Sequence, residues 1–204
     1  MDHKTGQLKA EQDKGLRWEI ESVEHLVEDK WIDFRRVAYR LPDQTVYEPF
    51  YSYSRRNYVV IVASDEDGNL ICVRQFRHGI GEVTTEFPAG GIETGSGIEH
   101  HTDGIIEDTL EAAKRELREE TGYESDQWEH LLTIPSNATM ADNYAYLYRA
   151  KNCRRVCDLQ LDETEFLIRE LKTPVEIEKL IQEGQFQQAM HILAWSLSKE
   201  RDRQ

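Results

Sequence analysis

The sequence predicts an α/β (α+β) fold in which helices cover a central sheet, preceded by an antiparallel β-unit. Three observations support this prediction. Residues 18–53 contain segments rich in β-branched and aromatic residues, as strands do. Residues 58–63 read YVVIVA, an almost continuous apolar run typical of a strand covered on both faces. Apolar residues spaced three and four apart, at 106–117 and 190–197, predict amphipathic helices.

The first 55 residues are predicted to form a tail and the β-unit. Residues 1–15 are polar and are expected to be frayed or disordered. Strands are expected at 18–27, 31–41 and 45–53, with the turn signal LPDQ between the second and the third. The aromatic faces of these strands must pack against some other surface.

Residues 56–204 are predicted to form the main domain. Its strands are expected at 58–63, 70–76, 128–134, 144–150 and 166–168. Thr173 to Glu176 reads as a capping box with proline at the first helical position, which starts a helix ending at Gly184. A second helix is expected at 187–199. Both should cover the sheet.

Composition narrows the class of protein. The chain has 204 residues, with 25 basic and 39 acidic side chains and a net charge of −14, which argues against nucleic-acid and anionic-membrane partners. No apolar run approaches a membrane span and the N-terminus is polar, so we expect a cytoplasmic protein without a signal peptide. Its three cysteines are expected to be reduced thiols, with a Cys153–Cys157 bridge as the less favoured alternative.

A row of carboxylates lies beside the apolar stripe of the helix predicted from Glu107 to Gly122. Glu116, Glu119 and Glu120 are spaced i, i+3 and i+4, so they project from one flank. Mg²⁺ takes oxygen ligands and binds between carboxylates and substrate phosphates. A bound Mg²⁺ would therefore offset the repulsion among the three glutamates. Arg115 can pair with Glu111 or Glu119. Taken alone, the run would be read as a solvated charged face.

The longer pattern favours the metal site. It runs Glu107, Arg115-Glu116-Leu117, Glu119-Glu120 and Gly122-Tyr123, with a glycine turn upstream. This string resembles the signature of the Nudix hydrolases, which cleave nucleoside diphosphates linked to another group. The resemblance implies an α-β-α sandwich with a mixed sheet. The spacing from Gly90 to Glu107 is longer than in the family's pattern, which predicts a loop insertion at about 95–106.

Two further strings resemble the ADP-ribose pyrophosphatase branch of that family: Arg74-Gln75-Phe76-Arg77 and Thr85-Glu86-Phe87-Pro88-Ala89-Gly90. The resemblance implies that Arg77 contacts the phosphates or the terminal ribose, that Glu86 binds substrate, and that the Ala89 carbonyl is a metal ligand together with the three glutamates. It also implies that the N-terminal β-unit exchanges with its mate in a homodimer. Without these neighbours, a surface arginine and a strand-end glutamate would be the simpler reading.

The attacking water needs a carboxylate to orient or deprotonate it. In the resembling family this glutamate lies in an acidic loop, here residues 161–165, where Glu163 and Glu165 match best; geometry must decide between them. Glu120 is the metal-binding residue whose loss should abolish turnover. Trp31 is either a platform for a nucleobase or a packed residue of the β-unit, with about equal weight.

The sequence departs from the branch at residues 135–143, where a Ser-Pro-Gly string and a glutamate are usual. Ala138 and Thr139 replace Pro-Gly, and Asn143 replaces the glutamate. The leading prediction is nonetheless Mg²⁺-dependent hydrolysis of ADP-ribose or a related nucleoside diphosphate sugar, with Mn²⁺ as the alternative ion. Dinucleoside polyphosphates or nucleoside triphosphates are alternative substrates, and a silent nucleotide-sugar sensor is the alternative class. The base and sugar preferred and the number of metals stay open.

Histidines occur at two further places where a function can be considered. The group Glu99, His100, His101 and Asp103 in the insertion could bind a transition metal, but solvated histidines are the commoner case. His191 is expected to be packed or exposed rather than catalytic.

Overall fold

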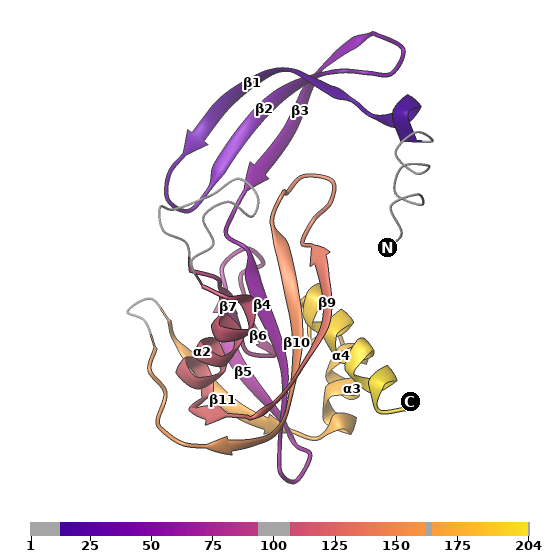
Figure 1. Ribbon diagram of the computed structural model, residues 1–204. Helices are drawn as coiled ribbons and strands as arrows, with labels where there is room; N and C mark the ends of the chain where they lie inside the picture. The colour runs from indigo at the N-terminus through magenta and orange to yellow at the C-terminus, as the bar shows by residue number, and fades with distance from the viewer. Residues whose placement is uncertain (1–12, 94–106, 162–164, 204) are drawn as a thin grey trace.

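The computed structural model describes residues 13–93, 107–161 and 165–203. After a short 3₁₀ helix, η1 (Asp13–Leu16), three strands form an antiparallel sheet in the order β1-β2-β3. They are β1 (Glu19–Glu28), β2 (Asp33–Arg40) and β3 (Val46–Ser54). This small sheet stands at one end of the molecule, above the main sheet in Figure 1. The predicted β-rich N-terminal segment is therefore a sheet of its own.

Within the described residues, the main sheet has eight strands. They are β4 (Tyr58–Asp65), β5 (Leu70–Arg77), β6 (Glu82–Glu86), β7 (Ala89–Gly91), β8 (Tyr123–Glu124), β9 (Gln127–Pro135), β10 (Tyr144–Arg155) and β11 (Leu167–Lys172). The central order is β11-β5-β4-β10-β8, with β6 on β5, β7 on β4 and β9 on β10. Strand β10 runs parallel to β4, whereas β5 and β7 run antiparallel to it. The sheet is mixed, as predicted.

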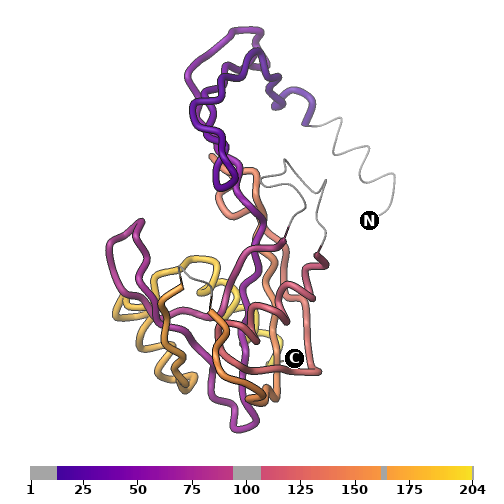
Figure 2. The backbone as a smooth tube through the Cα atoms, turned by 90° about the vertical axis from the view of Figure 1, so that its left-hand side faces the viewer, coloured from indigo at the N-terminus to yellow at the C-terminus, as the bar shows by residue number. Residues whose placement is uncertain are grey.

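Helices cover both faces of this sheet. Helix α2 (Thr109–Thr121) lies on one face, and α3 (Pro174–Gln182) and α4 (Ala189–Arg201) lie on the other (Figures 1 and 2). Alternation along β4 separates the two cores, because Val59 and Ile61 pack in the cluster under α2 while Val60 packs in the cluster with α4. The α-β-α arrangement with a mixed sheet is confirmed.

Helix α2 begins later than predicted. The Asp108 side chain accepts hydrogen bonds from the N–H groups of Leu110, at 2.9 Å, and Glu111, so it is the N-cap and the helix begins at Thr109. Glu107 therefore lies outside the helix, and the prediction that the helix starts at Glu107 is wrong. At the other end, Gly122 adopts φ 74° and donates its N–H to Arg118 O at 2.8 Å, a left-handed C-cap.

The N-terminal sheet is tied to the main domain through the loop after β9. Tyr53 donates its N–H to Met140 O at 2.8 Å. Asp142 accepts from Arg35 Nη2 at 3.0 Å and from Ser54 Oγ at 2.5 Å. Because these contacts join β2 and β3 to the loop before β10, the small sheet overhangs that end of the main sheet (Figure 2).

Several predicted features lie outside the described residues. They are the tail at 1–12, most of the insertion predicted at about 95–106 together with Glu99, His100, His101 and Asp103, and Glu163 of the acidic loop.

Two glycines provide a matched test of the α2 C-cap. Gly122 and Gly68 both have positive φ, at 74° and 82°, but a Cβ on Gly122 would overlap the Cys157 carbonyl, whereas one on Gly68 would have nothing within 4 Å. We expect Gly68→Ala to lower the free energy of unfolding by about 1 kcal/mol from backbone strain, and Gly122→Ala by about 2 kcal/mol more from overpacking. Urea denaturation of both variants measures this, and equal losses would contradict it.

Candidate active site

Two glutamates of α2 are buried side by side against β7. Glu116 is 7% exposed and Glu120 is 3% exposed, and Ala89 donates its N–H to Glu120 Oε2 at 2.9 Å. Burial raises the pKa of Glu116 to about 7. Burial, and then repulsion from Glu116, raises the pKa of Glu120 well above its ordinary value. A positive charge placed here would favour the ionised form of both acids.

Gly90 makes room for this pair. A Cβ on Gly90 would overlap the Glu116 carboxylate, whereas a Cβ on the neighbouring Gly91 would have no atom nearer than Arg56 Cδ at 3.8 Å. Strand β7 can therefore approach the helix because a glycine stands at position 90. The glycine turn and the glutamates, which are separate parts of the sequence motif, form one packed site.

Arg115 links the other carboxylates to this site. Its Nε and Nη2 donate to the two oxygens of Glu107 at 2.8 and 2.9 Å, and Nη2 also donates to Gly91 O at 2.9 Å. Its Nη1 donates to Glu116 Oε1 at 2.8 Å and to Glu119 Oε2 at 3.0 Å. The predicted Glu119 pair forms, but the alternative with Glu111 does not.

Glu111 instead accepts from Lys114 Nζ at 2.7 Å. This lysine lies one turn away on the exposed side of α2, so it can reach Glu111 without crossing the helix. Arg115 points the other way, toward β7.

The three glutamates predicted as ligands do not converge. Across residues 13–93, 107–161 and 165–203, no group of three His, Cys, Asp or Glu side chains is arranged to hold a metal ion. Arg115 Nη1 lies between Glu116 and Glu119, so only Glu116 and Glu120 share the buried position. Two buried carboxylates with raised pKa values, which offer only oxygen donors, fit a hard divalent cation that completes its shell with phosphate oxygens.

A cleft of about 610 Å³ lies along β7, the strand that packs on this pair; Glu116 and Glu120 themselves do not line it. Ala89, Gly90 and Gly91 form part of its wall, and Arg77 lines it. Arg77 donates from Nε and Nη2 to the two oxygens of Glu86 at 2.9 and 2.7 Å. Such a bidentate pair fixes the plane of the guanidinium.

Glu86, predicted to bind substrate, is fully buried and does not line the cleft. It also accepts from Thr84 Oγ1 at 2.7 Å. Its carboxylate therefore holds Arg77 in place from behind, and Arg77 presents the charge to the cleft.

His191 joins the same wall, which the sequence did not reveal. Its Nδ1 accepts from the Phe87 N–H at 3.1 Å, and its Nε2 lies 4.0 Å from Glu86 Oε2. Burial lowers the pKa of His191 to about 4, so the ring is neutral near pH 7 and Nε2 carries the proton. Phe87 and His191 are 104 positions apart in the sequence, which explains why no local pattern could link them.

The remaining predicted residues lie around the cleft and the carboxylates. Glu165 is near enough to contribute to the raised pKa values of both Glu116 and Glu120. Trp31 is 62% exposed and lines the cleft from the turn between β1 and β2. It is not part of the core of the β-unit, which was the alternative reading.

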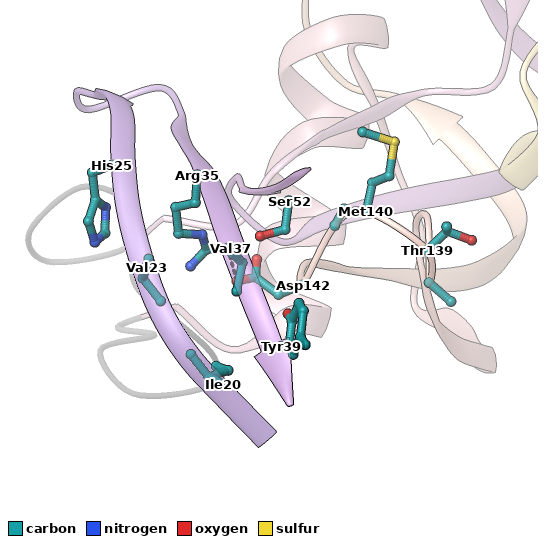
Figure 3. A pocket seen from close by; sticks show the side chains of 12 residues that line it. Ile20, Val23, His25, Arg35, Val37, Tyr39, Ser52, Thr139, Met140 and Asp142 are labelled. Carbon is teal, nitrogen blue, oxygen red and sulfur yellow. Dashed lines mark hydrogen bonds and ion pairs between the residues drawn. The ribbon is translucent and has the colours of Figure 1, made fainter. Parts of the chain in front are cut away.

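A second cavity, of about 490 Å³, lies between the N-terminal sheet and residues 138–142. Ile20, Val23 and Tyr39 lie on β1 and β2 on one side, and Thr139 and Met140 lie on the loop at the other side (Figure 3). The loop that departs from the Ser-Pro-Gly pattern thus forms the wall of this cavity.

Known proteins share this arrangement. The family model described as the NUDIX domain matches residues 54–191. The chain belongs to the Nudix family. The resemblance to the ADP-ribose pyrophosphatase branch, suggested by the sequence motifs, is confirmed by the relatives described next.

This Nudix chain is 34% identical over 110 residues to the methanol dehydrogenase activator of Bacillus methanolicus, covering 53% of this chain and 54% of that protein. It is 34% identical over 98 residues to the ADP-ribose pyrophosphatase of Mycobacterium tuberculosis, covering 48% and 42%. The matches thus span about half the length of each curated relative. A crystal structure of an ADP compounds hydrolase has the same fold, with TM-score 0.71, 20% identity and coverage of 91% and 94%.

Two further findings concern the helices and the cysteines. Over the part of the chain that the structure describes, no helix has the length and apolarity needed to cross a membrane. Cys72, Cys153 and Cys157 are free thiols, so the alternative of a Cys153–Cys157 bridge is not formed. Burial raises the pKa of Cys153 to about 11, which keeps that thiol protonated near neutral pH.

The glycine beside Glu116 gives a direct test of the site. We expect Gly90→Ala to displace the Glu116 carboxylate and weaken Mn²⁺ binding by about tenfold or more, as changes to groups that orient a ligand do. Gly91→Ala is the matched control, because its Cβ meets only ordinary contacts. Isothermal titration with Mn²⁺ measures both variants. Equal affinities in wild type and Gly90→Ala would exclude Glu116 from the metal site.

Proposed function

We propose that this protein catalyses Mg²⁺-dependent hydrolysis of the pyrophosphate bond of ADP-ribose or a related nucleoside diphosphate sugar. The products would be a nucleoside monophosphate and a sugar phosphate. The observation that carries the proposal is the buried Glu116 and Glu120 pair beside a cleft that also presents Arg77. The relative from Mycobacterium tuberculosis, an ADP-ribose pyrophosphatase, supports the same substrate class.

Glu116, Glu120 and the Ala89 carbonyl are the proposed ligands of Mg²⁺, with Mn²⁺ as the alternative ion. Bound there, the cation would neutralise charge on the diphosphate and lower the pKa of water. Glu119 would join the ligands by exchanging its bond to Arg115. The negative charge of the diphosphate must be neutralised because it repels the water that attacks phosphorus.

Arg77 is proposed to bind phosphate oxygens, and Glu86 contributes to substrate binding by fixing Arg77. A guanidinium whose plane is already set loses less freedom when it binds a phosphate, which favours a single orientation of the diphosphate. Trp31, exposed in the same cleft, is proposed to stack on the nucleobase.

Glu165 or Glu163 is proposed to orient the attacking water and accept its proton. The water oxygen forms a bond to one phosphorus, the bond from that phosphorus to the bridging oxygen breaks, and the second phosphate leaves with that oxygen. The influence of Glu165 on the pKa values of Glu116 and Glu120 supports its nearness to the reacting centre. Glu163 stays a candidate outside the described residues.

Two alternatives follow from the same family. A Nudix hydrolase of dinucleoside polyphosphates or nucleoside triphosphates would use the same carboxylates on a different substrate. A non-catalytic sensor of nucleotide sugars would bind ligand without cleaving it. The intact Glu116 and Glu120 pair favours catalysis over sensing, because a sensor has no need for two buried acids that await a cation.

Turnover by a matched pair of variants tests the proposal. Wild-type protein with Mg²⁺ should release a nucleoside monophosphate from ADP-ribose or a nucleoside diphosphate sugar, within a panel that includes dinucleoside polyphosphates and nucleoside triphosphates. Glu120→Gln keeps the shape but loses the anionic ligand, so we expect kcat to fall by about a hundredfold or more. Glu111→Gln, on the exposed side of α2, should keep full activity. Unchanged kcat in Glu120→Gln would reject the assignment.

We also propose that residues 1–55 mediate a homodimer and that residues 56–204 carry the hydrolase, in a cytoplasmic protein. Exposed apolar side chains on the N-terminal sheet support pairing, among them Ile20 at 64% and Val23 at 42%. Both lie on β1, an edge strand of that sheet, and a group of exposed apolar side chains marks an interaction surface.

Light scattering tests the dimer. We expect wild type to have twice the mass of one chain and Ile20→Asp combined with Val23→Asp to have the mass of one, because the charges would be buried at the interface. Val175→Asp, at an exposed position of α3, is the control. A wild-type monomer would refute the dimer.

A further inference from the structure

The cleft is strongly positive. Lys30, Arg55 and Arg56 line it together with Trp31, and the described lining contains no Asp or Glu. The fourth cation of the lining, Arg77, is the one that already has a carboxylate partner, because it pairs with Glu86 through two hydrogen bonds. A surplus of three positive charges in one cleft is unexpected in a chain whose net charge is −14.

The turn between β1 and β2 holds Lys30 and Trp31 in place. The Asp29 carboxylate accepts from the N–H groups of Trp31, at 2.7 Å, and Ile32, at 2.9 Å, which forms an Asx turn. Lys30 Nζ lies 4.7 Å from the centroid of the Trp31 ring. The Arg56 guanidinium lies 6.0 Å from the same centroid. Two cations, one from the turn between β1 and β2 and one from the connection between β3 and β4, thus meet at one aromatic ring.

These cations have no acidic partner. Over residues 13–93, 107–161 and 165–203, no carboxylate oxygen pairs with Lys30, Arg55 or Arg56 within 4.0 Å. Other arginines of the chain do have such partners, for example Arg36 with Glu24 at 2.9 Å. Three cations facing one space repel each other, so an anion bound between them would stabilise the site.

A neutral amide anchors the arginine segment from behind. Asn143 is buried, and its Nδ2 donates to Arg56 O at 3.0 Å while its Oδ1 accepts from Ser136 Oγ. A glutamate at this position could not donate to the carbonyl and would place a negative charge beside Arg55 and Arg56. Asn143 thus holds the segment while leaving its positive charge uncompensated.

We propose that the cleft accepts a nucleoside diphosphate compound carrying a third phosphate group, which Lys30, Arg55 and Arg56 bind beside Trp31. This rests on the proposed function, in which the metal site and Arg77 match the charge of the scissile diphosphate. Three further cations of the same lining, Lys30, Arg55 and Arg56, then remain for another anionic group. A further phosphate, on a ribose hydroxyl or within a longer phosphate chain, supplies the matching charge and accepts several charge-assisted hydrogen bonds.

Binding without turnover separates this inference from the proposed reaction. Isothermal titration of the full-length protein in EDTA would use two matched pairs of ligands. One pair is ADP-ribose and ADP-ribose with a phosphate on the adenosine 2′-hydroxyl; the other is diadenosine diphosphate and diadenosine triphosphate. Repulsion from Glu116 and Glu120 acts on both members of a pair, so the ratio of their dissociation constants reports the third phosphate.

In wild type, we expect the three-phosphate member of at least one pair to bind about tenfold more tightly, the worth of one charge-assisted hydrogen bond. Lys30→Gln and Arg56→Gln should each reduce that ratio to about threefold or less. Lys179→Gln removes the same charge from an exposed position on α3 and should leave the ratio unchanged. The pair that shows the preference identifies whether the phosphate is carried on the ribose or in the chain.

Two results would overturn the inference. Ratios within about threefold for both pairs in wild type would mean that the cations bind no third phosphate. A tenfold preference that persists in both Lys30→Gln and Arg56→Gln would place the phosphate elsewhere. Either result leaves the hydrolysis of ADP-ribose to be judged by the separate turnover assay, and a failure of turnover leaves these binding ratios intact.

Discussion

The structure around the site depends on the cost of burying two acids next to each other. Glu116 and Glu120 lie on one side of α2 under β7, and burial is the main reason that their pKa values are raised. Ala89 offsets part of this cost by donating its N–H to Glu120, and Gly90 lets β7 approach closely enough to do so. A pair held this way is stable either with protons or with a cation between the carboxylates and a phosphate.

Charge is separated along the cleft in a way that net charge does not predict. A chain of −14 should repel a phosphate-bearing ligand at long range. Within the cleft, however, the carboxylates lie behind β7, Arg77 is fixed by Glu86, and the cations near Trp31 face open space. Local placement therefore decides what can bind, since charges more than about 10 Å apart are largely screened at physiological salt.

Periodicity in the sequence is enough to predict the longer strands, the three α-helices and the α2 carboxylate row, because those features depend on neighbours a few residues apart. It does not predict the short strands β6, β7 and β8. It failed where distant residues compete. Glu107 was placed in the helix, but the Asp108 side chain caps α2 first, and Arg115 then holds Glu107 outside it. His191 could not be foreseen as a neighbour of Glu86, since their contact joins β6 to α4 across the sheet.

Arg115 holds Glu116 and Glu119 apart from a common metal position, yet leaves both carboxylates able to bind a cation. Its Nη1 is shared between Glu116 and Glu119, which keeps these like charges from repelling while no metal is bound. The same guanidinium makes three other bonds, two to Glu107 and one to Gly91 O. Releasing Glu116 or Glu119 would therefore cost one shared N–H and leave the arginine in place, so a divalent cation could take over the carboxylates without refolding the helix.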